Sequence, residues 1–290
     1  MTEAPYDAGR TPLDAAAVRA AVTRPGGLWR SVEVAAVTGS TNADLLARAA
    51  AGEPEGLVLA AEQQSAGRGR LGRAWVAPPR AALTFSVLLR PAAVPRARLG
   101  WLPLLAGVAV AAAIRTQAGV DARLKWPNDV LVGPAGVPAG GSGGVVPPRK
   151  LAGILAEAAG DAVVVGIGVN VSTGPAELPP PGPGGLAATS LAIEGAATAD
   201  RAVLLAGILA GLERRYRAWS AVSGDTERSG LRAEYTGLCG TLGRRVRVEL
   251  PGGRVLDGVA AALDPDGRLL ISVPPDADLP VAAGDIVHLR

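Results

Sequence analysis

Cysteine, histidine and aromatic side chains are scarce in this sequence. Its 290 residues include one cysteine and one histidine, and Phe, Trp and Tyr together make up 3%. A lone cysteine, Cys239, excludes a disulfide within the chain and a zinc cluster built on cysteines. A lone histidine, His288, argues against a Ser-His-Asp triad and against a histidine-built metal site. Any chemistry therefore has to use lysine, arginine, aspartate, asparagine and backbone groups, with or without a bound Mg²⁺.

Excess charge, targeting signals and long apolar runs are also missing. The formal net charge is only +3, and the basic residues gather in loops, which favours a small anionic ligand over a long duplex. The N-terminus has no basic region followed by an apolar core, so we expect no signal peptide. The most apolar stretch, residues 102–114, is too short to span a membrane and predicts a buried helix. We therefore expect a cytoplasmic protein.

The composition does provide for a core. Hydrophobic residues make up 49% of the chain, which argues against wholesale disorder. The length predicts one large domain, or a main domain with a small appendage. From Leu242 onward short apolar segments alternate with turns such as Gly252-Gly253, which is typical of a small β-barrel.

Periodicity and turn residues predict most of the secondary structure. We expect helices at residues 14–22, 43–51, 99–118, 200–219 and 231–235, with Asp14, Ser40 to Asn42 and Asp200 at helix starts. We expect strands at residues 32–37, 57–62, 83–89, 150–157, 162–171, 244–249, 255–260, 269–273 and 286–289. Residues 133–148 are rich in Gly, Pro and Ser and predict a mobile excursion.

The stretch from Ser65 to Trp75 holds three glycines and three arginines within residues 67–73. Glycine lets the backbone approach a ligand closely, and the arginine fork suits phosphate or carboxylate. The spacing also matches a dinucleotide fingerprint and a kinase glycine loop, but no helix opens on it and no His-Arg-Asp or Asp-Phe-Gly follows. Two interpretations of this loop remain. It covers an anionic, nucleotide-like ligand, or it binds a nucleic acid backbone.

Polar residues stand out in three further places. Ser40-Thr41-Asn42 at a strand-to-helix turn predicts a helix cap, a set of ligand hydroxyls, or both. Lys125-Trp126-Pro127-Asn128-Asp129 crowds charge into an apolar neighbourhood, which favours a site over an ordinary turn. Two glycines within the strand Gly166 to Asn170 indicate that a ligand or backbone packs against it.

Five motifs in order carry a family resemblance. They are Thr38 to Asn42, Gly67 to Trp75, Lys125 to Asp129, Lys150 to Leu155 and Gly166 to Asn170. The set resembles the biotin protein ligases, or biotin–[acetyl-CoA-carboxylase] ligases, over about residues 35 to 172, and the C-terminal strands agree in kind. Each motif alone is weak, but the ordered set is specific.

The resemblance implies a fold and an activity. The fold is α/β, a mixed sheet flanked by helices as in class II aminoacyl-tRNA synthetases and lipoate ligases, with a small SH3-like C-terminal barrel. Its domains here would be an N-terminal extension at residues 1–30, a catalytic domain at 31–238 and the barrel at 239–290. The activity is formation of biotinyl-5′-AMP from biotin and ATP with Mg²⁺, then transfer of biotin to a lysine of a biotin carboxyl carrier domain. Regulatory members carry an N-terminal DNA-binding domain, for which residues 1–30 are too short, so we expect a monofunctional ligase that binds no nucleic acid and no membrane.

The resemblance also implies roles for individual residues. Those implied for biotin are Ser40, Thr41, Asn42, Gln64, Arg68, Gly69, Arg70, Lys150 and Gly153. Those implied for ATP are Arg68, Arg70, Arg73, Trp75, Lys125, Asn128, Lys150 and Asn170, with Trp75 and Asn170 on the adenine. Those implied for catalysis are Lys150, Arg70, Lys125 and Asp129, and Asp129 is also the candidate metal ligand.

Two alternatives stay open. A lipoate or octanoate ligase has a related fold, but its pocket would have to hold a flexible chain instead of a rigid ureido ring. A nucleic-acid-binding regulator that responds to biotinyl-AMP is disfavoured by the modest net charge.

Overall fold

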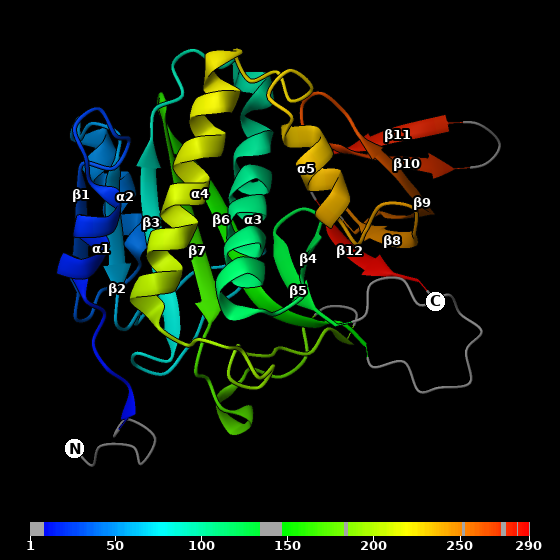
Figure 1. Ribbon diagram of the computed structural model, residues 1–290. Helices are drawn as coiled ribbons and strands as arrows, with labels where there is room; N and C mark the ends of the chain where they lie inside the picture. The colour runs from blue at the N-terminus through cyan, green and yellow to red at the C-terminus, as the bar shows by residue number, and fades with distance from the viewer. Residues whose placement is uncertain are drawn as a thin grey trace.

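The computed structural model describes residues 9–133, 147–182, 185–250, 253–273, 277–282 and 284–289. Within them, two β-sheets of unequal size lie side by side (Figure 1). The excursion expected at residues 133–148 falls almost wholly outside the described residues.

The larger sheet has seven strands in the order β1-β2-β3-β7-β6-β5-β4. These are β1 (Ser31–Ala35), β2 (Leu57–Ala61), β3 (Ala82–Leu89), β4 (Ala122–Lys125), β5 (Asp129–Val132), β6 (Arg149–Ala159) and β7 (Ala162–Asn170). Strands β1 and β2 run parallel, because helix α2 (Thr41–Ala50) connects them, and the other neighbours are antiparallel. The predicted mixed sheet is confirmed, and so is the hairpin of β6 and β7.

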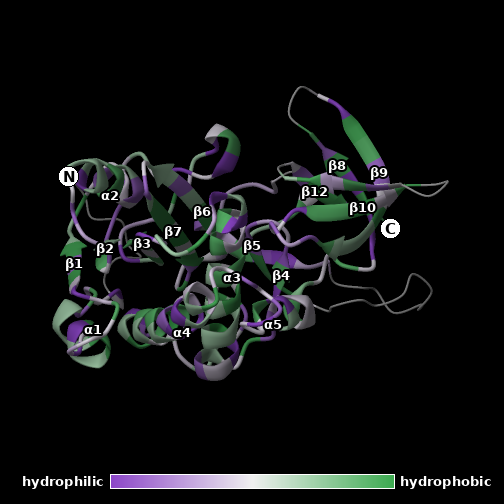
Figure 2. Cartoon of the chain, turned by 90° about the horizontal axis from the view of Figure 1, so that it is seen from above, coloured by the Kyte–Doolittle hydropathy of each residue, from purple (hydrophilic) through white to green (hydrophobic). Residues whose placement is uncertain are grey.

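Helices cover both faces of this sheet, although unequally. Helices α1 (Ala15–Val22), α3 (Trp101–Ala113), α4 (Arg201–Ala221) and α5 (Leu231–Leu238) lie on one face, and α2 lies on the other (Figure 2). Two apolar cores result, a large one under α3 and α4 and a small one under α2 that includes Leu45, Leu59 and Val164. The caps expected at Asp14 and Ser40 are present on α1 and α2, and Asp200, expected as the first residue of a helix, caps α4.

Helix α3 is the centre of the large core. With its flanking turns it forms a segment, Arg96–Ala118, that is long and apolar enough to cross a membrane by length and composition alone. In the fold it packs against the sheet beside α4, and nearly all its side chains are buried (Figure 1). It ends in a π-helical turn at Gly119, whose φ of 69° places it in the left-handed region that glycine adopts easily. The prediction of a buried helix is confirmed.

The smaller sheet has five antiparallel strands in the order β11-β10-β9-β8-β12. These are β8 (Arg245–Glu249), β9 (Val255–Leu263), β10 (Leu269–Val273), β11 (Ala277–Val281) and β12 (Asp285–His288). The SH3-like appendage is confirmed. Strand β11 was not predicted. It contains Pro280, which lacks an N–H, a loss that is tolerated at the edge of the sheet.

Tryptophan side chains join the two sheets. Trp126 follows β4, and its backbone N–H donates to the Thr241 hydroxyl at 3.1 Å. The indole of Trp126 donates to the carbonyl of Gly267, and the indole of Trp101 donates to that of Pro265. Both indoles are almost completely buried, so the turn between β9 and β10 forms part of the same core as α3.

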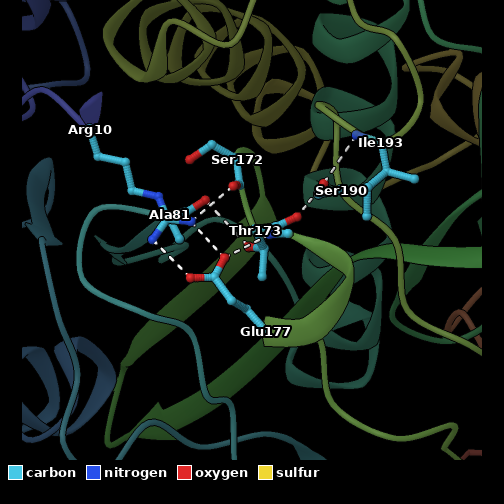
Figure 3. A network of polar contacts seen from close by, with 8 residues as sticks. Arg10, Ala81, Ser172, Thr173, Glu177, Ser190 and Ile193 are labelled. Carbon is cyan, nitrogen blue, oxygen red and sulfur yellow. Dashed lines mark hydrogen bonds and ion pairs between the residues drawn. The ribbon is translucent and has the colours of Figure 1, made fainter. Parts of the chain in front are cut away.

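A polar network anchors the N-terminal segment beside the end of β7 (Figure 3). Arg10 forms an ion pair of 2.6 Å with Glu177 and donates to the carbonyl of Ser172. Ser190 donates to the carbonyl of Thr173 at 2.7 Å. The chain that leaves β7 is therefore fixed from two directions.

Candidate active site

A cavity opens on the face of the larger sheet that carries α2. It is bounded by the start of α2, the loop at residues 65–75, and strands β3, β6 and β7. Of the residues predicted for the site, all but Lys125, Asp129 and Asn170 line it. Segments more than a hundred residues apart thus meet at one place.

One end of the cavity is rich in hydroxyl and amide groups. Ser40 caps α2, and its hydroxyl accepts from the backbone N–H of Ala43. The backbone N–H of Thr41 donates to Gln64 Oε1 at 2.8 Å, which ties α2 to the segment after β2. Ser40, Thr41 and Asn42 all line the cavity. Ser40 is therefore both helix cap and part of the cavity wall, and the binding of a ligand by these residues stays a prediction.

Glycines on β6 and β7 form the floor of the cavity. A Cβ atom on Gly166 would lie 2.2 Å from Asn42 Oδ1, and one on Gly168 would lie 2.4 Å from Trp75 Cε2. Gly153, opposite Gly168 in the sheet, also lies under the indole. Among the described residues the buried Trp75 Nε1 has no hydrogen-bond partner. The strand glycines therefore make room for two side chains of the site.

The loop at residues 65–75 closes on itself like a short hairpin. The backbone N–H of Gly69 donates to the carbonyl of Arg73, and that of Trp75 donates to the carbonyl of Gly67. The loop is also tied to other parts of the fold, because Arg70 donates to Asn128 Oδ1 at 3.1 Å and Arg73 pairs with Asp285 of β12. The smaller sheet thus contributes a carboxylate to the edge of the site.

Cationic groups surround one carboxylate at the other end of the cavity. Lys150 Nζ lies 2.6 Å from Asp129 Oδ1, and Lys125 Nζ lies 3.9 Å from Asp129 Oδ2. Burial lowers the pKa of Lys125, Asp129 opposes that shift, and Lys150 adds to it. Burial likewise lowers the pKa of Arg70, opposed by Asp285 and Asp129. Three cations around one anion leave a positive excess that suits an anionic ligand.

Three predicted residues, Lys125, Asp129 and Asn170, lie outside the cavity lining. Lys125 contacts the Asp129 carboxylate, which in turn pairs with Lys150 of the cavity lining. Asn170 is buried two positions beyond Gly168 on the same face of β7, and its amide donates to the carbonyl of Thr189 at 2.9 Å. Its implied contact with adenine stays a prediction.

Comparison with known proteins shows which family the chain belongs to. Residues 34–172 match the biotin/lipoate A/B protein ligase family, and residues 241–289 match the biotin protein ligase C-terminal domain. A biotin–[acetyl-CoA-carboxylase] ligase of Mycobacterium tuberculosis is 44% identical over 285 residues, 97% of either chain. The chain belongs to the biotin protein ligase family.

Other members of the biotin protein ligase family are more distant. The bifunctional ligase/repressor BirA of Bacillus subtilis is 35% identical over 169 residues, 57% of this chain and 47% of that protein. The structure of the Aquifex aeolicus biotin protein ligase in complex with biotin and ATP superposes with a TM-score of 0.69 at 26% identity. It covers 90% of this chain and 100% of that one.

A metal ion has little protein to hold it in this site. Among the residues that the structure describes, no three His, Cys, Asp or Glu side chains cluster as metal ligands do. Asp129, the candidate ligand, is already paired with two lysines. Protein-bound Mg²⁺ commonly uses one or two carboxylates and takes the rest of its ligands from water and substrate phosphates. The residues fit a Mg²⁺ that phosphates bring with them, and do not form a cage of their own.

Three polar residues of the biotin protein ligase site were missed by the sequence analysis. Ser86 of β3 contacts Thr41 from beneath, Glu157 of β6 contacts Asn42, and Asp285 pairs with Arg73. Glu157 had a signal, since it is a charged residue within an apolar strand. Ser86 and Asp285 had none, because their importance comes from pairing across the fold.

Proposed function

We propose that this chain activates biotin with ATP and then transfers biotin to a lysine of a biotin carboxyl carrier domain of an acyl-CoA carboxylase. The observation that carries the proposal is the single cavity with hydrogen-bonding groups at one end and a cationic cluster at the other. The similarity to the Mycobacterium tuberculosis ligase over nearly the whole chain supports it. We further infer that the protein acts in the cytoplasm.

In the first step a carboxylate oxygen of biotin attacks the α-phosphorus of ATP, and pyrophosphate leaves. The carboxylate is ionised at pH 7, so this step needs no general base. It needs cations that reduce the repulsion between two anions and stabilise charge as it develops. Lys150 and Arg70 line the cavity and occupy these roles, and Lys125 acts from behind Asp129. A Mg²⁺ bound to the phosphates would supply further charge neutralisation.

In the second step a lysine amine of the carrier attacks the acyl carbon of biotinyl-AMP, and AMP leaves. The mixed anhydride has to be protected from water until the amine arrives. The loop at residues 65–75, anchored through Arg70 to Asn128 and through Arg73 to Asp285, covers this part of the cavity. The family resemblance implies that Asn128 or Asp129 positions this amine, and Asn128 lines the cavity.

The test is incubation of the chain with MgATP, a carrier domain and either biotin or lipoate, followed by mass measurement of the carrier. We expect biotin to be attached and lipoate not. Attachment of lipoate without biotin would replace this proposal by the related lipoate ligase function.

A further inference from the structure

A row of hydrogen-bonded side chains runs beneath the Thr41 end of the cavity. The Thr41 hydroxyl lies 2.7 Å from the hydroxyl of Ser86, a completely buried residue. Ser86 Oγ lies 2.6 Å from Asn42 Oδ1. Asn42 Nδ2 lies 2.8 Å from Glu157 Oε2 and 3.2 Å from the carbonyl oxygen of Leu155. The row therefore begins at a carboxylate of β6 and ends at a wall of the cavity.

The direction of each hydrogen bond follows from the far end of the row. A backbone carbonyl and an ionised carboxylate can only accept hydrogen bonds. The Asn42 atom that faces both Leu155 and Glu157 must therefore be its NH₂ group, which turns the Asn42 oxygen toward Ser86. Ser86 has to donate its single hydroxyl proton to that oxygen.

Ser86 then has no proton left for Thr41. Two hydroxyl oxygens 2.7 Å apart need a proton between them, so Thr41 must donate to Ser86. The Thr41 hydroxyl also lies 3.1 Å from Gln64 Oε1, but its single proton goes to the shorter contact with Ser86, while Gln64 Oε1 accepts the backbone N–H of Thr41 at 2.8 Å. Toward the cavity, the Thr41 hydroxyl is left with lone pairs only.

We propose that Glu157 and Ser86 are positioning residues that fix the Thr41 hydroxyl as a hydrogen-bond acceptor, so that the cavity selects a ligand ring with an N–H donor. This inference rests on the proposed function, because the ureido ring of biotin carries N–H groups and the dithiolane ring of lipoate carries none. Sites whose buried polar groups are already oriented reject ligands that leave those groups unpaired.

Two neutral substitutions of Glu157 separate its acceptor oxygen from its charge. Glu157→Gln keeps an oxygen that can hold the Asn42 NH₂ group, and we expect the biotin KM to rise less than threefold. Glu157→Leu removes the carboxylate acceptor and leaves the Asn42 NH₂ group with only the Leu155 carbonyl at 3.2 Å, and we expect a rise of about tenfold, as for the loss of one net hydrogen bond. The KM for ATP and kcat should stay within about twofold in both variants, because the cationic end of the cavity is untouched.

Ser86→Ala tests whether Glu157 acts through the row. We expect it to raise the biotin KM at least as much as Glu157→Leu does. The double variant should then be no worse than Ser86→Ala alone, because the link has already been cut. Glu33→Leu is the matched control: Glu33 accepts from Arg48 at 2.7 Å away from the cavity, so the biotin KM should not change.

Equal effects of Glu157→Gln and Glu157→Leu would overturn the inference, and so would additive effects in the double variant. A change in all kinetic constants with a lower melting temperature would make Glu157 a structural residue. If the native chain bound biotin and formed no biotinyl-AMP, the proposed function would fail, and the same comparison of biotin Kd by calorimetry would still decide the role of Glu157.

Discussion

Lys150→Ala should slow the formation of biotinyl-AMP far more than it slows transfer to the carrier. The ammonium group lines the cavity, where it interacts more strongly as charge builds on the α-phosphate. Removal of one preorganised donor to a transition state slows a reaction on the order of 10²–10³-fold. Transfer from preformed biotinyl-AMP should be slowed less, because the pyrophosphate has already left.

The ion pair with Asp129 adds a second effect to that variant. Without Lys150, the nearest cation to Asp129 is Lys125, whose Nζ lies 3.9 Å from Oδ2. Two unit charges about 4 Å apart interact by about 4 kcal/mol at an effective dielectric constant of 20. The Asp129 carboxylate, no longer paired with Lys150, would repel the phosphates of ATP. A repulsion of this size slows the reaction about as much as the loss of the ammonium group itself. The double variant Lys150→Ala/Asp129→Asn removes both charges and isolates the role of the ammonium group.

Single-turnover measurement of each half-reaction checks this prediction. If Lys150 acts directly, the double variant stays slow in the first half-reaction by about 10² or more. Lys150→Arg should recover only part of the rate, because a wide planar fork does not replace a compact charge. Full recovery in the double variant would reduce Lys150 to a counter-ion of Asp129. Equal slowing of both half-reactions would place it outside the chemistry of activation.

Three further variants test other parts of the protein. Gly168→Ala should raise the KM for ATP about tenfold, because the added Cβ would lie 2.4 Å from the Trp75 ring and displace the ring. Tryptophan fluorescence should then report greater solvent exposure of Trp75. Unchanged ATP binding would contradict this prediction. Asp285→Asn should change the free energy of unfolding by less than about 1 kcal/mol, because its partner Arg73 is partly exposed. It should nevertheless speed the release of biotinyl-AMP, measured by stopped flow. An unchanged release rate would show that this ion pair does not hold the loop in place. Burial lowers the pKa of His288 from 6.5 to about 4, with nearby positive charges adding to the shift. Between pH 6.5 and 4 the unfolded chain therefore binds a proton that the folded chain does not bind. The free energy of unfolding should be highest above pH 6.5 and fall by about 3 kcal/mol as the pH drops to 4. His288→Gln should remove this part of the pH dependence, as measured by denaturant titrations at each pH.

The elements of the fold were predictable where a local pattern marks them. Ser40 and Asp200 cap helices as their residue types suggest, and Gly119 ends α3 in the left-handed conformation. Strand β11 was missed. Its Pro280 contradicts a strand locally, and only its place at the sheet edge permits it. Local rules cannot know which strand will be an edge.

The residues of the cavity wall were predictable from the sequence, but the buried residues that contact them from behind were not. Motif order brought Thr41 and Lys150 into one prediction, and the structure places both in the cavity wall. Ser86 and Glu157 lie 44 and 115 residues from Asn42 and touch it only because β3, β6 and α2 meet. Asp285 is farther still from its partner in the loop. Such contacts have no local signature, because sheet register decides them.

The tryptophan junction between the two sheets has a thermodynamic consequence. Trp101 and Trp126 bury their rings in a core shared by both sheets and donate to carbonyls of the β9–β10 turn. Neither sheet can open without exposing these rings and leaving those donors unpaired, so the two should unfold in one cooperative transition. Any ligand that binds the folded cavity then stabilises the whole unit by mass action. Strands of the small sheet should therefore exchange their amide hydrogens more slowly when the cavity is full.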